Sequence, residues 1–176
     1  MSETNFDNAR AMIEALTPSY PVYCLRARVL AETAREFLER FPGRVLYAVK
    51  CNPHPLVLQA LYDAGIRHFD TASLPEIAQV REMFSDASAY FMHPVKARAV
   101  IKTSHDVYGV RHFVIDHPSE LAKVIDETGG EGVAVIVRMA TPHAGPAFDL
   151  STKFGASPAL AAHLLRAVRY AGCQGG

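Results

Sequence analysis

Cysteine is scarce in this chain of 176 residues. The three cysteines, Cys24, Cys51 and Cys173, are far apart, odd in number and form no C-x-x-C pair. This pattern excludes the disulfide framework of small secreted proteins and is typical of proteins from a reducing compartment. We therefore expect a cytoplasmic protein.

Net charge is also absent, since 18 Lys and Arg residues balance 18 Asp and Glu residues. A balanced chain with no basic run gives no support for binding to nucleic acid or to an anionic membrane. The first ten residues are polar and unlike a signal peptide, and no apolar run has membrane-spanning length. We expect a soluble protein whose partner is a small molecule.

Several catalytic motifs are missing as well. The eight histidines show no H-E-x-x-H or other ligand spacing, so no metal site is expected. No G-x-G-x-x-G follows an apolar run, which disfavours dinucleotide binding. The serines and cysteines have no visible base partner, so nucleophilic hydrolysis has no support.

Short apolar runs alternate with longer amphipathic stretches along the chain. The hydrophobic content of 49% can support a core. The predicted strands are residues 44–49, 67–70, 89–92, 112–116 and 133–138, and the predicted helices are residues 27–41, 55–64, 74–84, 96–105, 118–128 and 157–171. This order predicts an α/β fold with parallel strands and helical crossovers. Both an open doubly wound sheet and a (β/α)₈ barrel fit, and a barrel would be roughly three strands short.

Helix ends carry recognisable signals. Ser73 and Glu76 have the spacing of a capping box, and Pro118 suits a first helical turn. Glycines, including Gly65, Gly109 and the Gly129–Gly130 pair, fall where helices are predicted to end.

Lys50 ends the apolar run that begins at residue 44. Alternation along a strand places Leu46, Ala48 and Lys50 on one face, and functional groups gather at the carboxyl ends of parallel strands. The small Ala48 leaves room for a ligand beside Lys50. A partly desolvated lysine can supply the neutral amine that forms a Schiff base. The alternative is a lysine that only marks where the strand meets water.

Five ordered motifs carry a resemblance to a known family. They are YAVK (47–50), FDTASLPE (69–76), FVIDHPSELAKV (113–124), IVRMATP (136–142) and LSTKFGA (150–156). Over residues 20–172 the chain resembles the fold-type III decarboxylases that depend on pyridoxal 5'-phosphate (PLP), and within them the ornithine decarboxylase group. The resemblance implies an alanine racemase-like (β/α)₈ TIM barrel, here truncated after about five strands.

The resemblance also implies roles for individual residues. In the family the YAVK lysine carries PLP as an internal aldimine, which corresponds to Lys50. It implies that Asp70 is a carboxylate of the site and that Arg138 lies in the cofactor site. Ala48, which strand alternation places next to Lys50, would then lie beside the cofactor. Asp70 could instead be a turn residue before the next helix.

Three further residues lie in the same motifs. Glu76 is explained by the capping box, so a catalytic role is the weaker interpretation. His93 stands where relatives have the asparagine of N-P-x-K, and we expect it near the site as a residue that tunes substrate choice or as a spacer. For Lys153 we expect a structural or interface role.

The resemblance implies decarboxylation of a basic amino acid, ornithine or lysine, to a diamine of polyamine biosynthesis. The family's later motifs, which hold the phosphate and the pyridine nitrogen, do not occur here. We therefore expect residues 1–176 to be the N-terminal part of the PLP-binding barrel, without the C-terminal β domain and inactive alone, and the full-length protein to be a homodimer. The alternatives are a diaminopimelate decarboxylase or racemase on this barrel, a non-catalytic homologue that binds partners, and an unrelated doubly wound binding domain.

Overall fold

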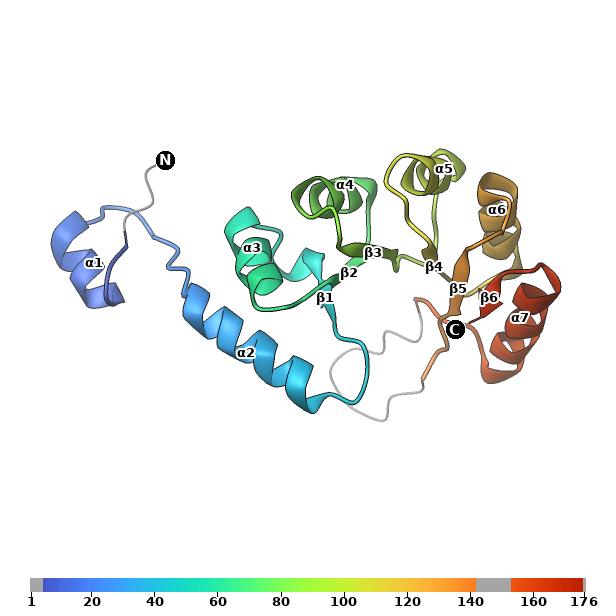
Figure 1. Ribbon diagram of the computed structural model, residues 1–176, viewed down its shortest axis with the longest axis horizontal. Coiled ribbons are helices and arrows are strands. Elements are labelled where there is room, and N and C mark those ends of the chain that lie inside the picture. Colours follow the sequence, from blue (N-terminus) through green and yellow to red (C-terminus); the bar gives the residue numbers. More distant parts are fainter. Residues whose placement is uncertain (1–4, 142–152, 176) are drawn as a thin grey trace.

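The computed structural model describes residues 5–141 and 153–175. Helices and short strands alternate along these residues, as the apolar pattern predicts (Figure 1). The elements are α1 (Ala9–Leu16), α2 (Ala27–Arg40), β1 (Leu46–Ala48), the 3₁₀ turn η1 (Val49–Cys51), α3 (Pro55–Asp63), β2 (His68–Thr71), α4 (Leu74–Met83), β3 (Ser88–Phe91), α5 (Arg98–Asp106), β4 (His112–Ile115), α6 (Pro118–Thr128), β5 (Ala134–Val137), α7 (Pro158–Tyr170) and β6 (Gln174–Gly175).

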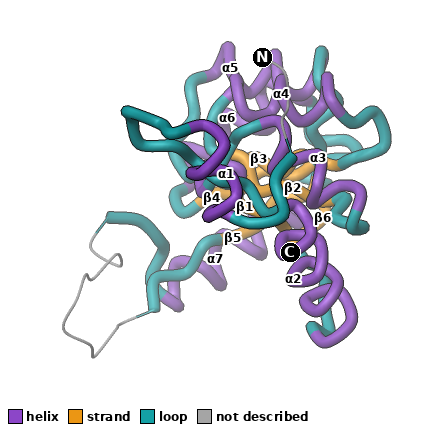
Figure 2. Tube along the Cα trace, turned by 90° about the vertical axis from the view of Figure 1, so that its left-hand side faces the viewer, coloured by secondary structure: helices purple, strands orange, loops and turns teal. Residues whose placement is uncertain are grey.

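The strands form one parallel sheet in the order β1-β2-β3-β4-β5-β6. The sheet is bent into an arc with α3 to α7 along its outer side (Figure 1), and Figure 2 shows the strands at the centre with helices around them. A doubly wound sheet reverses its strand order at a switch point and carries helices on both faces. The sequential order therefore excludes that alternative and confirms the α/β class with the arrangement of a partial barrel.

The expected number of about five strands is too low by one. The sixth, Gln174–Gly175, pairs with Ala134 and Val135 of β5. Two residues, one of them glycine, are too few to show an alternating or apolar pattern, so no strand is predicted there.

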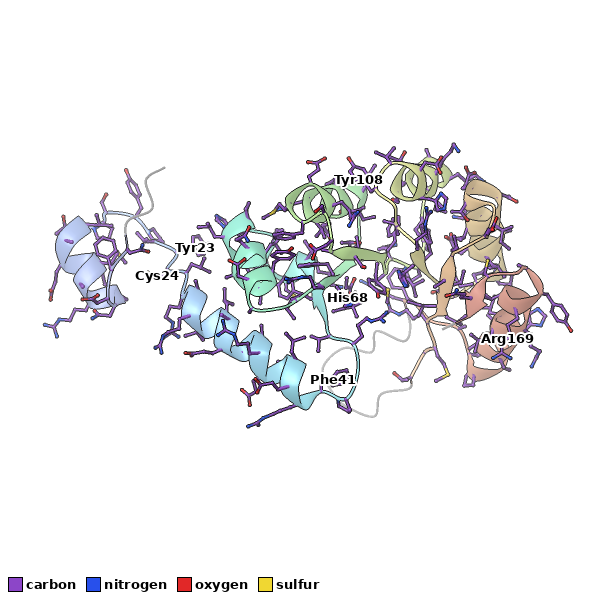
Figure 3. The ribbon with its side chains drawn as sticks, in the orientation of Figure 1. Tyr23, Cys24, Phe41, His68, Tyr108 and Arg169 are labelled. Carbon is purple, nitrogen blue, oxygen red and sulfur yellow. The ribbon has the colours of Figure 1, made fainter. Side chains whose placement is uncertain are left out.

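The two faces of the sheet differ in polarity. Phe69, Phe113 and Ile115 are fully buried in the apolar core under the helices. The alternate positions on the same strands face the inside of the arc, where Figure 3 shows His68. Polar groups therefore gather on the inner face, and the main core lies between the sheet and its helices.

Helix ends follow the predicted signals in part. Gly129 ends α6 in the left-handed conformation, with φ of 75°. The predicted capping box at α4 is wrong in detail. Ser73 makes no side-chain capping bond, and Glu76 instead accepts a hydrogen bond from the backbone N–H of Ala72 at 2.8 Å. Glu76 therefore fixes the turn that follows β2.

Helix α1 is absent from the sequence-based predictions and lies away from the sheet (Figure 1). The side chain of Asn8 caps it by accepting a bond from the N–H of Ala11 at 2.9 Å. Tyr23 and Cys24 lie on the segment that joins α1 to α2 (Figure 3). Across residues 5–141 and 153–175, no helix combines the length and hydropathy needed to span a bilayer.

Candidate functional site

Lys50 lies just past the carboxyl end of β1. The strand ends at Ala48, and the chain then forms the turn η1, in which Val49 is fully buried and Lys50 is exposed. The predicted strand alternation from Leu46 to Lys50 is therefore wrong at its last member, because the backbone leaves the extended conformation before Lys50. The buried Val49 anchors the turn, so Lys50 stays at the edge of the sheet and open to solvent.

The residues after Lys50 explain why the strand stops there. The side chain of Asn52 accepts a hydrogen bond from the N–H of His54 at 3.1 Å. The Nδ1 atom of His54 then caps α3 by accepting from the N–H of Leu56 at 3.3 Å. Pro55 takes the first helical position, where a missing N–H costs nothing.

Asp70 lies beside Ala48 in the register of β1 and β2. The carboxyl group is half-buried, and its pKa is raised above the ordinary value mainly by burial. Lys50 lowers this pKa, Glu76 raises it and Arg138 lowers it. These charges act on Asp70 because all lie near the same edge of the sheet.

Arg138 follows β5 directly. Its N–H donates to the carbonyl oxygen of Ile115 at 2.8 Å, and its own carbonyl accepts from the N–H of Ala156 at 2.9 Å. The guanidinium carbon lies 5.4 Å from the ring centre of Phe154. Arg138 is three strands away from β2 in a sheet that is bent into an arc (Figure 1). Its charge lowers the pKa of Asp70, in agreement with this curvature.

The structure thus brings together all four residues expected at the site: Lys50, Ala48, Asp70 and Arg138. Each lies at or just beyond the carboxyl end of its strand. Strand alternation and the rule that parallel strands present their carboxyl ends at one edge predicted Lys50 and Ala48 there, and the family resemblance implied Asp70 and Arg138. Their roles remain proposals.

His93 follows β3 at the same edge. Its ring meets that of Phe154 edge-on, with 5.5 Å between ring centres and 73° between planes. This contact places His93 beside the ring that also packs on Arg138, in agreement with the expectation that it lies near the site. Lys153 is exposed, and nothing in its surroundings tests its expected role.

Sequence reasoning missed a buried ion pair behind this edge. Lys96 and Glu120 are 3% and 4% exposed, and the Lys96 Nζ atom lies 3.4 Å from Glu120 Oε2. The same ammonium donates to the carbonyl oxygens of His93, Pro94 and Val114 at 3.1, 2.9 and 2.6 Å. The network ties the loop after β3 to β4 and α6.

Lys96 is expected to make the stability of the fold depend on pH. Burial lowers the pKa of its ammonium to about 8, against which Glu120 acts to raise it. Because the value in the unfolded chain is about 10.4, the unfolded chain binds more protons at this site between those values. The free energy of unfolding is therefore expected to rise from pH 8 to about pH 10 relative to Lys96→Met, as measured by urea unfolding. If the free energy of unfolding changed equally with pH in the two proteins, the lowered pKa of Lys96 would be contradicted.

A second polar cluster lies on the inner face, nearer the amino ends of the strands. The hydroxyl group of Tyr90 accepts from Arg44 Nη1 at 2.9 Å and lies 3.3 Å from His68 Nδ1. The ring of Tyr90 stacks on His112, with 4.0 Å between ring centres. Burial, then the charge of Arg44, lowers the pKa of both histidines. This cluster holds neighbouring strands together on the inner side of the arc.

The residues at the carboxyl edge fit the aldehyde end of PLP. An exposed lysine amine, a half-buried carboxylate and a guanidinium form a set that can bind a carbonyl compound covalently and balance its charge. Within residues 5–141 and 153–175, no group of His, Cys, Asp and Glu side chains could hold a metal ion.

Comparisons with known proteins agree with this arrangement. The family described as "Pyridoxal-dependent decarboxylase, pyridoxal binding domain" matches residues 7–174. The lysine/ornithine decarboxylase of Selenomonas ruminantium is 36% identical over 172 residues, which cover 96% of this chain and 43% of the relative.

Solved structures show the same fold. A mutant of SrLDC, the lysine decarboxylase from Selenomonas ruminantium, in complex with PLP matches with a TM-score of 0.78 and 32% identity, over 97% of this chain and 44% of that one. The lysine/ornithine decarboxylase of Vibrio vulnificus with putrescine matches with a TM-score of 0.77 and 26% identity, over 96% and 44%. The arc of strands thus corresponds to the barrel portion of these enzymes, and the chain spans less than half of their length.

Proposed function

Because the chain belongs to the pyridoxal-dependent decarboxylases, in which it matches the pyridoxal-binding domain, we propose that the whole protein decarboxylates a basic amino acid, lysine or ornithine, with PLP. The observation that carries this proposal is the exposed Lys50 beside the half-buried Asp70, at the carboxyl edge of the sheet. The similarity to a lysine/ornithine decarboxylase supports the choice of substrate.

Each residue of the site has a proposed task. The amine of Lys50 is the group that links to the cofactor's aldehyde, and the small side chain of Ala48 leaves space beside it. Asp70 balances the charge of the Lys50 ammonium, and Arg138 compensates the charge of Asp70. PLP, when bound, supplies the electron sink for the bond that breaks.

The proposal extends to the rest of the protein. We take residues 1–176 as the N-terminal part of the PLP-binding barrel and the complete protein as a homodimer with a C-terminal β domain. Residues that select the substrate side chain then lie largely outside this chain, and an edge strand such as β1 or β6 pairs with the remaining strands of the barrel.

The test is covalent labelling of the full-length protein. After addition of PLP and reduction with borohydride, we expect the cofactor's mass on the peptide that contains Lys50. Lys50→Ala should abolish both the label and the absorbance band near the visible edge that PLP linked to the lysine gives before reduction. The matched control is Lys102→Ala, which removes an exposed lysine from α5 and should leave both unchanged.

Activity assays then define the reaction. CO₂ release from lysine or ornithine, lost in Lys50→Ala, is the expected result. A full-length protein that takes no label at Lys50 would rule out the PLP assignment. Release from diaminopimelate, or racemisation without CO₂, would replace the proposed reaction with a different one on the same barrel.

A further inference from the structure

Residues 153–156 dock onto the end of β5. Ala156 pairs with Met139 in a parallel bridge, and the N–H of Ala140 donates to the carbonyl oxygen of Ala156 at 2.9 Å. The N–H of Gly155 donates to the carboxylate of Asp116 at 2.9 Å. The backbone bonds of Ala156 and the bond from Gly155 to the Asp116 carboxylate therefore hold this segment at the end of β5.

The docking places Phe154 in contact with two side chains of the carboxyl edge. The guanidinium of Arg138 lies over its ring at 5.4 Å, and the imidazole of His93 meets the ring edge-on at 5.5 Å. A guanidinium within about 6 Å of a ring centre is attracted to the ring's electrons. Phe154 therefore contacts Arg138 through an interaction that depends on an aromatic ring.

The second side chain in contact with Phe154, that of His93, is also held in place. The Nδ1 atom of His93 lies 2.7 Å from the carbonyl oxygen of Val95, which orients the imidazole. The carbonyl group of His93 accepts from the buried ammonium of Lys96 at 3.1 Å. The imidazole is thus a fixed support against which the ring of Phe154 rests.

We propose that Phe154 is a positioning residue for Arg138. Its ring, in contact with the guanidinium and with the imidazole of His93, keeps the positive charge of Arg138 near Asp70. This inference rests on the proposed function, because Asp70 matters there as the carboxylate beside the PLP-binding lysine. Phe154 acts through Arg138 and does not itself touch the reacting atoms.

The electrostatics of the site agree with this role. Burial raises the pKa of Asp70, and Arg138 is one of two positive charges that oppose the rise. Coulomb energy falls with distance, so a guanidinium free to turn toward solvent would compensate the carboxylate less well. A ring that holds the guanidinium in place therefore helps to keep Asp70 ionised.

The experiment compares Phe154→Leu with Phe154→Tyr in the full-length protein. Leucine keeps apolar bulk but removes the ring, whereas tyrosine keeps the ring. One readout needs no cofactor: the pKa of Asp70, from the carbon resonance of its carboxyl group during an NMR titration. The other is the dissociation constant of PLP, from the Lys50-dependent absorbance.

Phe154→Leu is expected to raise the pKa of Asp70 and to weaken PLP binding about two- to fivefold, the fold-change that corresponds to one partly exposed cation–π contact. Phe154→Tyr should restore both values. No change with leucine, or equal changes with leucine and tyrosine, would overturn the proposal, and so would a lower thermal midpoint without a change at Asp70. If the unaltered protein takes no label at Lys50, the proposed function fails, and the Asp70 titration alone decides whether Phe154 positions Arg138.

Discussion

Glutamine in place of Glu120 is expected to destabilise the protein by about 3–5 kcal/mol, because removing one partner of a buried ion pair leaves the other charge uncompensated. The carboxylate is 4% exposed and lies between two ammonium groups, those of Lys96 and Lys123. Glutamine has almost the same shape, so the loss would arise from charge and not from a cavity. The measurement is the free energy of unfolding in urea at pH 7.

The matched control is Glu32→Gln. Glu32 pairs with Arg28 at 3.2 Å on the exposed surface of α2, where such pairs contribute about 0–1 kcal/mol. A large difference between the two substitutions is expected, and similar losses would show that burial does not set the strength of the Glu120 network. In Glu120→Gln the pKa of Lys96 should also fall further, because Glu120 is the first of the groups that raise it.

The Glu120 network matters for the site because of where its bonds go. The ammonium of Lys96 holds the carbonyl groups of His93 and Val114, and so joins the turn after β3 to β4. His93 in turn supports the ring of Phe154. The buried pair of Lys96 and Glu120 therefore helps to position the carboxyl edge of the sheet, at which Lys50 is exposed.

Most of the fold follows from local rules. The helix from Pro118 to Thr128 has a proline at its first position and a glycine just past its end, and the structure places both ends there. Lys50 was expected at the carboxyl edge because functional groups gather where parallel strands end. Neither prediction requires knowledge of contacts between distant residues.

Other features depend on contacts that a sequence pattern cannot show. Lysine is rarely buried, so nothing marks Lys96 as the centre of a network until β4 and α6 surround it. The pairing of Phe154 with Arg138 arises from the bridge between Met139 and Ala156, which are not neighbours in the sequence. Lys50 departs from strand alternation because a 3₁₀ turn begins one residue earlier, and an apolar run does not show where a strand stops.

Alanine in place of Gly155 is expected to detach the segment that carries Phe154. Gly155 has a φ of 110°, and a Cβ atom there would lie 2.6 Å from the backbone nitrogen of Ala140. The left-handed backbone costs about 1–2 kcal/mol for a residue with a side chain, and overpacking against backbone costs about 1–3 kcal/mol more. Since the backbone of Ala140 cannot turn away as a side chain could, we expect the bridge to Ala156 to open.

Hydrogen exchange of two amides measures this opening directly. The N–H groups of Ala140 and Ala156 donate in the bridge, so their protection should be lost in Gly155→Ala. Gly109→Ala is the matched control, because Gly109 also has positive φ, 67°, but no atom lies within 4 Å of the added Cβ. It should cost only the backbone term, about 1–2 kcal/mol, and leave both amides protected. Protected amides in Gly155→Ala would contradict the prediction, because they would mean that the bridge to Ala156 tolerates the added Cβ atom.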